Sequence, residues 1–309
     1  MAEKKFYYGG QAVIEGVMMR GKTTMATATR HPNGEIGVDH RTLHNLYTGV
    51  WRKTPLTRGV IALIESLVLG IQTLMNSANI ALEEEKTELS GWKMWGIILV
   101  AMAFSVGVFF LIPLWIASLI KPLGTGIYFN LFEGVVRVIL FIAYLKIVSL
   151  MKDIRRVFAY HGAEHKAINT YEGGDPLEVE YARKYSTANP RCGTSFLFAV
   201  LIIAILVFSV FSAFKPNPFM IVASRIVLLP VIAALGYEFI YFTSRHCGNP
   251  IMNALLTPGL WLQKLTTREP DDQQLEVALA ALKSVLQAEQ PEKYPAPVQP
   301  SPIIELPVP

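Results

Sequence analysis

The chain has 309 residues, of which 52% are hydrophobic and only 17% are charged, and its mean hydropathy is +0.36. This composition excludes an ordinary soluble two-domain protein, because the apolar residues are also gathered in long blocks. The formal net charge of +4 favours attraction to anionic lipid over nucleic-acid binding, so the lipid bilayer is the expected partner and nucleic acid is not.

The first predicted element is a small β unit between Phe6 and about Leu43, assigned to residues 1–50. Its segments are short, β-branched and partly alternating, and the string HPNGE predicts a hairpin centred on Asn33–Gly34. The unit is too small for an independent core, so we expect it to pack on the surface of the membrane domain. The segment Met1–Val50 also lacks the basic-then-apolar start of a signal peptide.

A mostly apolar helix follows from Arg58 to Leu82, within a segment assigned to residues 51–90. Polar side chains recur along it at or near helical spacing, at Glu65, Gln72, Asn76 and Asn79. Basic residues flank the helix on both sides, so a crossing would leave one basic group outside. We therefore favour an interfacial or re-entrant helix, with its polar stripe facing protein, over a fifth span.

Two uncharged stretches come next in chain order. Residues 94–120 and residues 192–214 contain no charged side chain, giving runs of 27 and 23 residues. A helix crosses the hydrocarbon core in about 20 residues, so both stretches are long enough to span. Each is followed by a short loop with proline or glycine, at Lys121–Gly126 and Lys215–Met220, which we expect on the outer side.

Two further spans carry a few charges, one from about Ile127 to Leu150 and the other from about Ile221 to Phe242. Neither shows the polar face that a soluble core helix of this length would have. The fold class expected is thus a mainly α polytopic membrane protein with four transmembrane helices in two hairpins. These hairpins are assigned to residues 91–150 and 194–243.

Basic residues predict the orientation of these spans. The segments before Met94, between Lys152 and Arg191, and after Ser244 hold 11, 7 and 5 Lys/Arg, whereas the two short loops hold one lysine each. Because basic residues accumulate on the cytoplasmic side, both termini and the Lys152–Arg191 loop are predicted to be cytoplasmic.

Five charged side chains lie inside the predicted spans, namely Glu133, Arg137, Lys146, Arg225 and Glu238. Glu133 and Arg137 are four residues apart and can neutralise one another as a structural ion pair, although a functional role stays open for a charge this deep in a bilayer. Arg225 lies near an outer helix end, where we expect it to snorkel toward water.

The segment 244–290 is predicted to hold an amphipathic surface helix. Pro270 and Asp271–Asp272 supply good helix-start chemistry. Leucines then recur on one face, at Leu275, Leu279, Leu282 and Leu286. The proline-rich tail 291–309 is predicted to be disordered.

The most specific chemical signal is the string HGAEH in the cytoplasmic loop assigned to residues 151–193. On a helix, His161 and His165 lie on one face and can bind one metal ion, and Glu164 can act as the general base. The predicted cofactor is a divalent metal ion, with zinc as the first candidate. A catalytic site of this type also needs a third protein ligand and an open position for water. Two histidines that only cap a helix leaving lipid are the alternative.

The third ligand is expected among polar groups on the same predicted side. The candidates are Glu238, Cys192, Glu172, His246 and Cys247, with Glu238 and Cys192 placed first. The two cysteines face a reducing compartment, so a structural disulfide is not expected and an inert thiol is the alternative for each.

Four strings in order resemble the YqhQ-like family, whose members are bacterial integral membrane proteins of unknown function described as predicted metal-dependent enzymes. The strings are YGGQAVIEGVMMRG (Tyr8–Gly21), DIRRVFAYHGAEHKAINTYE (Asp153–Glu172), PRCGTSF (Pro190–Phe196) and PGLWLQKLTTREPDD (Pro258–Asp272). The resemblance extends to about Gln287 and implies a multi-pass protein of the bacterial cytoplasmic (inner) membrane. It implies no particular reaction.

The resemblance also identifies further candidate site residues. The matching positions are Gly9, Gly10, Gln11, Glu15, Gly16, Arg20, His161, Gly162, Glu164, His165, Lys166, Arg191 and Cys192, whereas Cys247 lies outside the family's motifs. In the first motif, glycines permit close backbone approach around Gln11, Glu15 and Arg20. Glu15 could therefore supply an acidic ligand, and a strand with glycine turns is the alternative.

The sequence supports three hypotheses of function. The first is a membrane-embedded metal-dependent hydrolase with its site at the cytoplasmic boundary and an unknown substrate. The second is a non-catalytic membrane scaffold or binding protein. The third is a small-solute transporter, which would need to form a homo-oligomer because four spans are few for a monomeric pathway.

Overall fold

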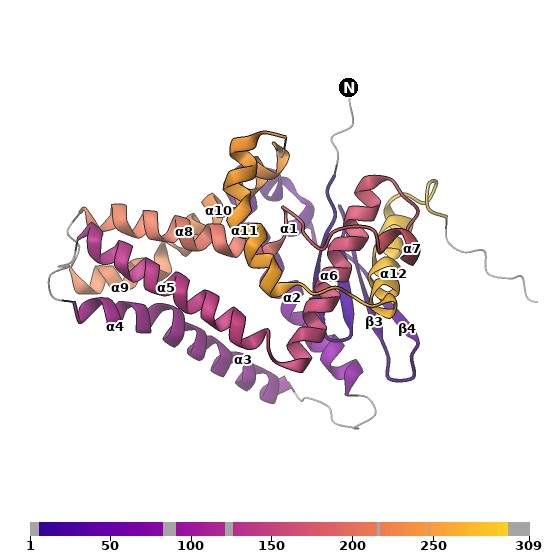
Figure 1. Ribbon diagram of the computed structural model, residues 1–309, viewed down its shortest axis with the longest axis horizontal. Helices are drawn as coiled ribbons and strands as arrows, with labels where there is room; N and C mark the ends of the chain where they lie inside the picture. The colour runs from indigo at the N-terminus through magenta and orange to yellow at the C-terminus, as the bar shows by residue number, and fades with distance from the viewer. Residues whose placement is uncertain (1–5, 83–90, 121–125, 215–216, 247, 296–309) are drawn as a thin grey trace, which may run out of the picture.

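The computed structural model describes residues 6–82, 91–120, 126–214, 217–246 and 248–295. The described chain is mainly helical, with one small antiparallel sheet near its start (Figure 1). The strands are β1 (Gly9–Val13), β2 (Gly16–Arg20), β3 (Thr24–Arg30) and β4 (Ile36–Thr42). The helices are α1 (Asn45–Thr48), η1 (Val50–Arg52), α2 (Thr57–Ala81), α3 (Gly91–Val106), the π-helical turn η3 (Gly107–Leu111), α4 (Ile112–Ser118), α5 (Ile127–Val148), α6 (Lys152–Gly173), α7 (Val179–Ala182), α8 (Gly193–Ser212), α9 (Pro218–Val227), α10 (Leu229–Arg245), α11 (Pro250–Thr266) and α12 (Asp272–Glu289).

The sheet is a meander with the strand order β1-β2-β3-β4. Gly34, in the turn between β3 and β4, has a φ of +88°, a conformation that glycine adopts without steric cost. The hairpin predicted at Asn33–Gly34 is therefore confirmed. β1 forms a free edge of the sheet within the described chain, and the site described below lies beside it.

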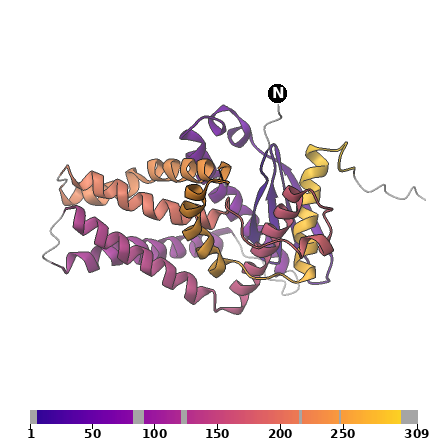
Figure 2. The same ribbon diagram turned by 45° about the horizontal axis from the view of Figure 1, so that its top comes forward.

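The sheet is covered on both faces. Val17 and Met19 of β2 point to one face and enter the main hydrophobic core, together with side chains of α6 and α12. Met18 of β2 and Met25 of β3 point to the other face, where Leu69 of α2 packs against them. This alternation follows from the period of two along a strand. The β unit thus obtains its core from helices far away in sequence (Figure 2).

The predicted C-terminal amphipathic helix is α12. Asp271 and Gln274 form a capping box at its start, which satisfies N–H groups at the helix N-terminus. All four predicted leucines are buried in the main core, namely Leu275, Leu279, Leu282 and Leu286. The helix lies against the sheet and α6 (Figure 2).

Three helices among the described residues are long and apolar enough to cross a membrane: Thr57–Ala81, Trp95–Ser118 and Gly193–Ser212. Two bent helix pairs raise this number to as many as five, if each pair counts as one span. Only 6% of the Trp95–Ser118 window is buried within the chain. So large an exposed apolar surface is consistent with a membrane protein.

The predicted span Ile221–Phe242 is not one straight helix. It consists of α9 and α10, which meet at Leu228 with a bend of 45°. Pro230 lies in the first turn of α10, where its ring and missing N–H interrupt the hydrogen-bond ladder of a continuous helix. The prediction of an uninterrupted span was therefore wrong in this detail.

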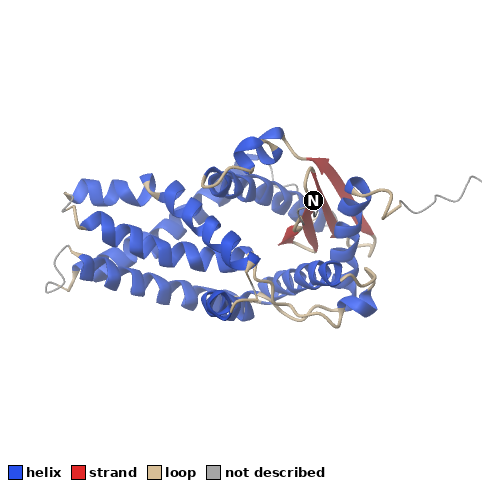
Figure 3. Ribbon diagram, turned by 90° about the horizontal axis from the view of Figure 1, so that it is seen from above, coloured by secondary structure: helices blue, strands red, loops and turns tan. Residues whose placement is uncertain are grey.

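A second bend separates the HGAEH string from the apolar helix before it. α5 ends at Val148, α6 begins at Lys152, and their axes differ by 100°. The polar helix thus turns sharply away, so it does not prolong α5. Figure 3 shows the sheet and its covering helices at one end of the molecule, with the long helices extending away from them.

Three charged residues of α5 and α9 form one buried cluster. Glu133 pairs with Arg137 on α5, as predicted, and also with Arg225 on α9 at 2.6 Å. Arg137 Nε donates to the carbonyl of Phe109 in the π-helical turn at 2.8 Å. Arg225 is buried, so the prediction that it snorkels was wrong, because Glu133 and the ring of Phe208 provide partners inside the bundle.

Candidate metal centre

The HGAEH string lies in the buried middle of α6, between the sheet and the segment that follows α11. Arg268 N–H in that segment donates to the carbonyl of Phe158 at 2.9 Å. A Cβ added at Gly162 would come within 2.0 Å of the Arg268 carbonyl oxygen. Glycine at this position therefore allows the backbone after α11 to lie directly on α6.

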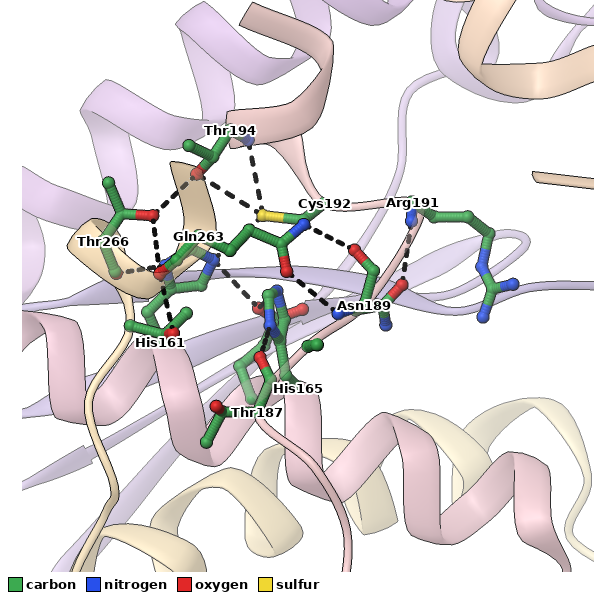
Figure 4. Close-up of polar contacts among 12 residues, drawn as sticks. His161, His165, Thr187, Asn189, Arg191, Cys192, Thr194, Gln263 and Thr266 are labelled. Carbon is green, nitrogen blue, oxygen red and sulfur yellow. Dashed lines mark hydrogen bonds and ion pairs between the residues drawn. The ribbon is translucent and has the colours of Figure 1, made fainter. Parts of the chain in front are cut away.

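Backbone carbonyls fix the orientation of both imidazoles. Nδ1 of His161 lies 2.8 Å from the Thr266 carbonyl, and Nδ1 of His165 is hydrogen-bonded to the Thr187 carbonyl (Figure 4). A carbonyl can only accept, so each Nδ1 must carry the proton and each Nε2 keeps a free lone pair. This arrangement is typical of metal-binding histidines, whose second nitrogen is usually held by an outer partner.

Cys192 brings a sulfur atom to the same place. Its Sγ lies 3.2 Å from Nε2 of His161 and also accepts from the N–H of Thr194 at 3.3 Å, as the N-cap of α8. One ligand atom each from His161, His165 and Cys192 lies within 4.8 Å of the other two. Histidine, cysteine and acidic side chains can all bind metal ions. Among the described residues, these three are the set of such side chains that lies close enough together to hold one ion.

The donor set fits a divalent metal ion such as zinc. Ligand atoms around a tetrahedral zinc ion, with bonds of about 2.0–2.3 Å, lie roughly 3.3–3.8 Å apart. The separation of 3.2 Å between His161 Nε2 and Cys192 Sγ is close to this range. Two imidazoles and one thiolate leave a fourth position open, which is the composition of a catalytic site rather than of a closed structural one.

Glu164 adds a carboxylate beside the two imidazoles. Its Oε2 lies 3.6 Å from Nε2 of His165 and 3.9 Å from Nε2 of His161. The side chain is buried, and burial raises its pKa to about 7, although the electrostatic interaction with His161 and a hydrogen bond from the Gly10 N–H both act to lower it. A carboxyl group with this pKa can take up and release a proton near neutral pH.

The glycine motif of β1 explains how Glu164 is enclosed. A Cβ added at Gly10 would come within 2.9 Å of Glu164 Cγ and within 2.5 Å of the Met18 carbonyl oxygen. Only glycine lets the edge strand pass this close to α6 and donate its N–H to the carboxylate.

A buried glutamine holds the chain segment that carries Cys192. Gln263 of α11 donates through Nε2 to the Asn189 carbonyl and to Ser195 Oγ, both at 2.7 Å, and accepts from Asn189 N–H at 3.0 Å (Figure 4). The loop before α8 is therefore fixed to α11. Since Thr266 ends α11, one helix positions both the cysteine segment and a carbonyl partner of His161.

A cavity of about 480 Å³ lies next to these groups. Its lining comes from β1, β2, α2, α6, the start of α8 and α10, and it includes His161, Glu164, His165 and Cys192. Cavities of this size hold small ligands or part of a larger one. The candidate metal ligands are therefore accessible to a ligand.

Two candidates for the third ligand, Glu238 and His246, lie outside this group. Glu238 pairs with Arg58 and also accepts from the Leu56 N–H at 2.9 Å. His246 is exposed, and its Nδ1 bonds the Phe242 carbonyl one turn back on α10. Arg58, at the start of α2, lies opposite Glu238 and forms this ion pair. No local sequence pattern indicates that α2 and α10 approach each other here. Cys247 is outside the described residues.

Two other acidic candidates are engaged in ion pairs. Glu15 pairs with Arg156 and accepts from Tyr160 Oη at 3.2 Å, so its carboxylate is directed at the start of α6. Glu172 binds Arg191 through both of its oxygens at 2.5 Å.

Three of the remaining candidates, Gln11, Arg20 and Arg191, line the cavity without joining the ligand group. Their amide and guanidinium groups carry hydrogen-bond donors, which can contact a bound ligand.

The sequence did not indicate several groups that shape the site. The carbonyls of Thr187 and Thr266 are backbone groups. Every residue has one, so the sequence does not distinguish these two. Glu65 was seen only as part of a polar stripe, and it faces the cavity together with Arg52 and Tyr237. The polar stripe on α2 was the one signal that could have placed Glu65 there.

Comparison with known proteins defines the class to which these features belong. A family model described as a protein of unknown function (DUF1385) matches residues 54–288, and the chain belongs to this family. The chain is also 35% identical over 300 residues to the uncharacterized protein YqhQ of Bacillus subtilis (strain 168), covering 91% of this chain and 93% of that protein. These matches confirm the resemblance to a YqhQ-like family. No solved structure matches the chain.

Proposed function

We propose that this protein is a membrane-embedded metal-dependent hydrolase. The observation that carries the proposal is the convergence of His161 Nε2, His165 Nε2 and Cys192 Sγ beside a buried carboxylate and a cavity. A divalent ion bound by these three residues would supply Lewis acidity at this end of the cavity.

The protein's own groups have separate tasks in such a reaction. The carbonyls of Thr187 and Thr266 keep both imidazoles in the tautomer that directs Nε2 toward the cavity. Glu164 accepts a proton from attacking water and returns it to the leaving group, for which its raised pKa is suited.

Metal analysis of the detergent-purified chain tests this proposal. We expect about one divalent ion per chain after incubation with zinc, and near-complete loss of it in His161→Ala and Cys192→Ser, since a three-ligand site does not survive loss of a ligand. His246→Ala is the matched control, because this exposed histidine bonds only a carbonyl of its own helix among the described residues. A wild type without bound metal, indistinguishable from His161→Ala, would refute the proposal.

We further infer four membrane crossings with the site on the cytoplasmic side of a bacterial inner membrane. The sheet and α6 share one hydrophobic core, so they must lie on the same side. Between them the chain passes through α2, the α3–α4 rod and α5, and an even number of crossings is required. Since the α3–α4 rod and α5 make one hairpin, α2 stays at the interface. The same reasoning, applied from α6 to α12, gives crossings by α8 and the α9–α10 pair and none by α11.

The arrangement of the long helices supports this topology. The end of α4, the start of α5, the end of α8 and the start of α9 lie together at the end of the molecule far from the sheet (Figure 1). They flank the two short loops with one lysine each, whereas the basic segments lie at the other end.

Thiol labelling tests the topology. Single cysteines at Asn33, Asp175 and Asn217, all exposed positions, are introduced in a background without Cys192 and Cys247. An impermeant reagent applied to intact cells should label only position 217. Labelling at position 33 would contradict the interfacial assignment of α2, and labelling at position 175 would reverse the orientation.

A membrane scaffold or binding protein is the second candidate. It is favoured by family-motif residues whose ion pairs lie within the sheet–α6–α12 unit and do not reach the histidines. Examples are Glu15, which pairs with Arg156, and Asp272, which pairs with Arg183. Full biological function of Glu164→Gln in cells would favour this candidate, because binding alone does not need the carboxylate to carry a proton. Transport is less supported, since Glu133, Arg137 and Glu238 all lie in ion pairs.

A further inference from the structure

The cavity carries a second polar cluster that the proposed reaction does not use. Arg20 Nε donates to one oxygen of Glu65 at 2.8 Å, and Arg52 Nε donates to the other at 3.1 Å. Arg52 Nη1 also donates to Tyr237 Oη at 2.8 Å. Two guanidinium groups share one carboxylate, so this wall of the cavity has one positive charge in excess.

The two arginines also keep donors for a ligand. Hydrogen bonds within the described chain occupy Nε and Nη2 of Arg20, and Nε and Nη1 of Arg52. Nη1 of Arg20 and Nη2 of Arg52 have no hydrogen bond of this kind within the described chain, and both residues line the cavity. Guanidinium N–H groups bind the oxygens of phosphates and carboxylates strongly and with defined geometry. An oxyanion group is therefore the ligand chemistry that this wall fits.

The mouth of the cavity is apolar. Leu67 of α2 and Leu197 of α8 line the cavity, yet they are 55% and 49% exposed. Side chains that face a cavity and the exterior at once mark its rim. Both helices are long and apolar enough to contact a bilayer along their length. Leu197 lies only about one turn inside α8, so the rim is at the level of the interface in the proposed topology.

We propose that the substrate is an anionic membrane lipid, with its oxyanion headgroup between the Arg20–Arg52 pair and the His161–His165–Cys192 group, and with its acyl part leaving between α2 and α8 past Leu67 and Leu197. This inference rests on the proposed function, because it identifies the substrate class of the same site. A soluble anion would satisfy the arginines but would have no use for the apolar rim.

Lipid binding to the full-length protein in a neutral detergent tests this proposal. The probes are phosphatidylglycerol, phosphatidylcholine with the same acyl chains, and glycerol 3-phosphate as the headgroup anion without chains, each measured by native mass spectrometry. We expect phosphatidylglycerol to bind about ten-fold more tightly than phosphatidylcholine, and glycerol 3-phosphate not to compete with it.

Variants separate the two halves of the lipid site. Arg20→Gln should weaken phosphatidylglycerol binding about ten-fold, since one charge-assisted contact is lost. Phosphatidylcholine binding should fall less, because its headgroup ammonium already offsets the charge of its phosphate. Leu67→Trp should obstruct the rim and weaken binding of both lipids. Leu74→Trp is the matched control, because Leu74 is two turns further along the exposed face of α2, is 41% exposed and does not line the cavity.

Equal affinity for the two lipids, competition by glycerol 3-phosphate, or the same effect from Leu67→Trp and Leu74→Trp would each overturn the proposal. Thermal unfolding of each variant checks that it is folded. If Arg20→Gln does not fold, the preference of the wild-type protein for phosphatidylglycerol over phosphatidylcholine still tests the proposal. Metal analysis of the same samples separates the two proposals. Bound metal without lipid preference overturns the lipid inference alone, whereas lipid preference without metal retains the lipid site and overturns the reaction.

Discussion

Glu133 and Glu164 are both buried carboxylates, but their surroundings differ. Glu133 lies between Arg137 and Arg225, so both of its oxygens receive a guanidinium. Glu164 has two imidazoles at 3.6 and 3.9 Å and a single backbone N–H. A carboxylate with a guanidinium on each oxygen holds helices together, whereas one with few donors can exchange a proton. The partners, and not the burial, separate a structural acid from a candidate catalytic one.

The largest expected effect follows from replacing the proton-carrying acid. Glu164→Gln keeps the size of the side chain and removes the basic oxygen, so turnover of the lipid substrate should fall by about 10²–10⁴-fold. Metal content should stay near the wild-type value, because the two imidazoles and the thiolate are unchanged. Product formation in detergent–lipid micelles measures turnover, and elemental analysis measures the metal content. Unchanged turnover would make Glu164 as structural as Glu133.

Glu133→Gln should act on stability instead. Removing the carboxylate leaves two buried guanidinium groups without their counter-charge, which costs roughly 3–5 kcal/mol of unfolding free energy. Metal binding should persist in the fraction that is folded, since the ion cluster lies outside the site. Denaturant titration in detergent provides the measurement, with exposed Glu180→Gln as a control expected within about 0.5 kcal/mol. A Glu133→Gln protein as stable as Glu180→Gln would show that the ion cluster does not contribute to the unfolding free energy.

Gly162→Ala tests how tightly the backbone around the histidines is set. The new Cβ would lie 2.0 Å from the Arg268 carbonyl oxygen, so the segment that provides the Thr266 carbonyl must move away from His161. Metal affinity should fall by about 10–100-fold, as for loss of an outer partner of a histidine ligand. Gly193→Ala is the matched control, because a Cβ there meets nothing within 4 Å although Cys192 is adjacent. Equal metal affinity in both variants would contradict this account of Gly162.

The smallest effect concerns a third carboxylate, Glu289 at the end of α12. It accepts from the backbone N–H groups of Thr23 and Thr24, at 2.8 and 3.1 Å. Burial acts to raise its pKa, but these hydrogen bonds outweigh burial and hold the pKa below its ordinary value of 4.5. A lowered folded-state pKa means that the stabilisation is complete above pH 4.5 and is lost as the pH falls through the folded-state pKa.

Glu289→Gln should therefore lower the unfolding temperature near neutral pH, and the gap to the wild type should close in acid. Unfolding curves between about pH 6 and pH 3 measure this. A gap that is independent of pH would show that the ionised form is not what α12 uses to hold the turn between β2 and β3.

Local sequence determined much of the architecture. The Asn33–Gly34 turn, the leucine face of α12 and the Glu133–Arg137 pair were each readable, because glycine conformation, helical spacing and charge pairing act over a few residues. The two histidines and Glu164 were readable for the same reason, since positions three and four apart share a helix face.

Only the tertiary structure decided the partners. Cys192 joined the histidines and Glu238 did not, although the sequence analysis placed both first among the candidates for the third ligand. Arg225 turned inward and did not reach toward water, because Glu133 of α5 lies 2.6 Å from it and provides a counter-charge inside the bundle. Spacing specifies which side chains share a face of one helix. Which helices then meet depends on close backbone approaches, such as those at Gly10 and Gly162, whose partners are distant in the chain.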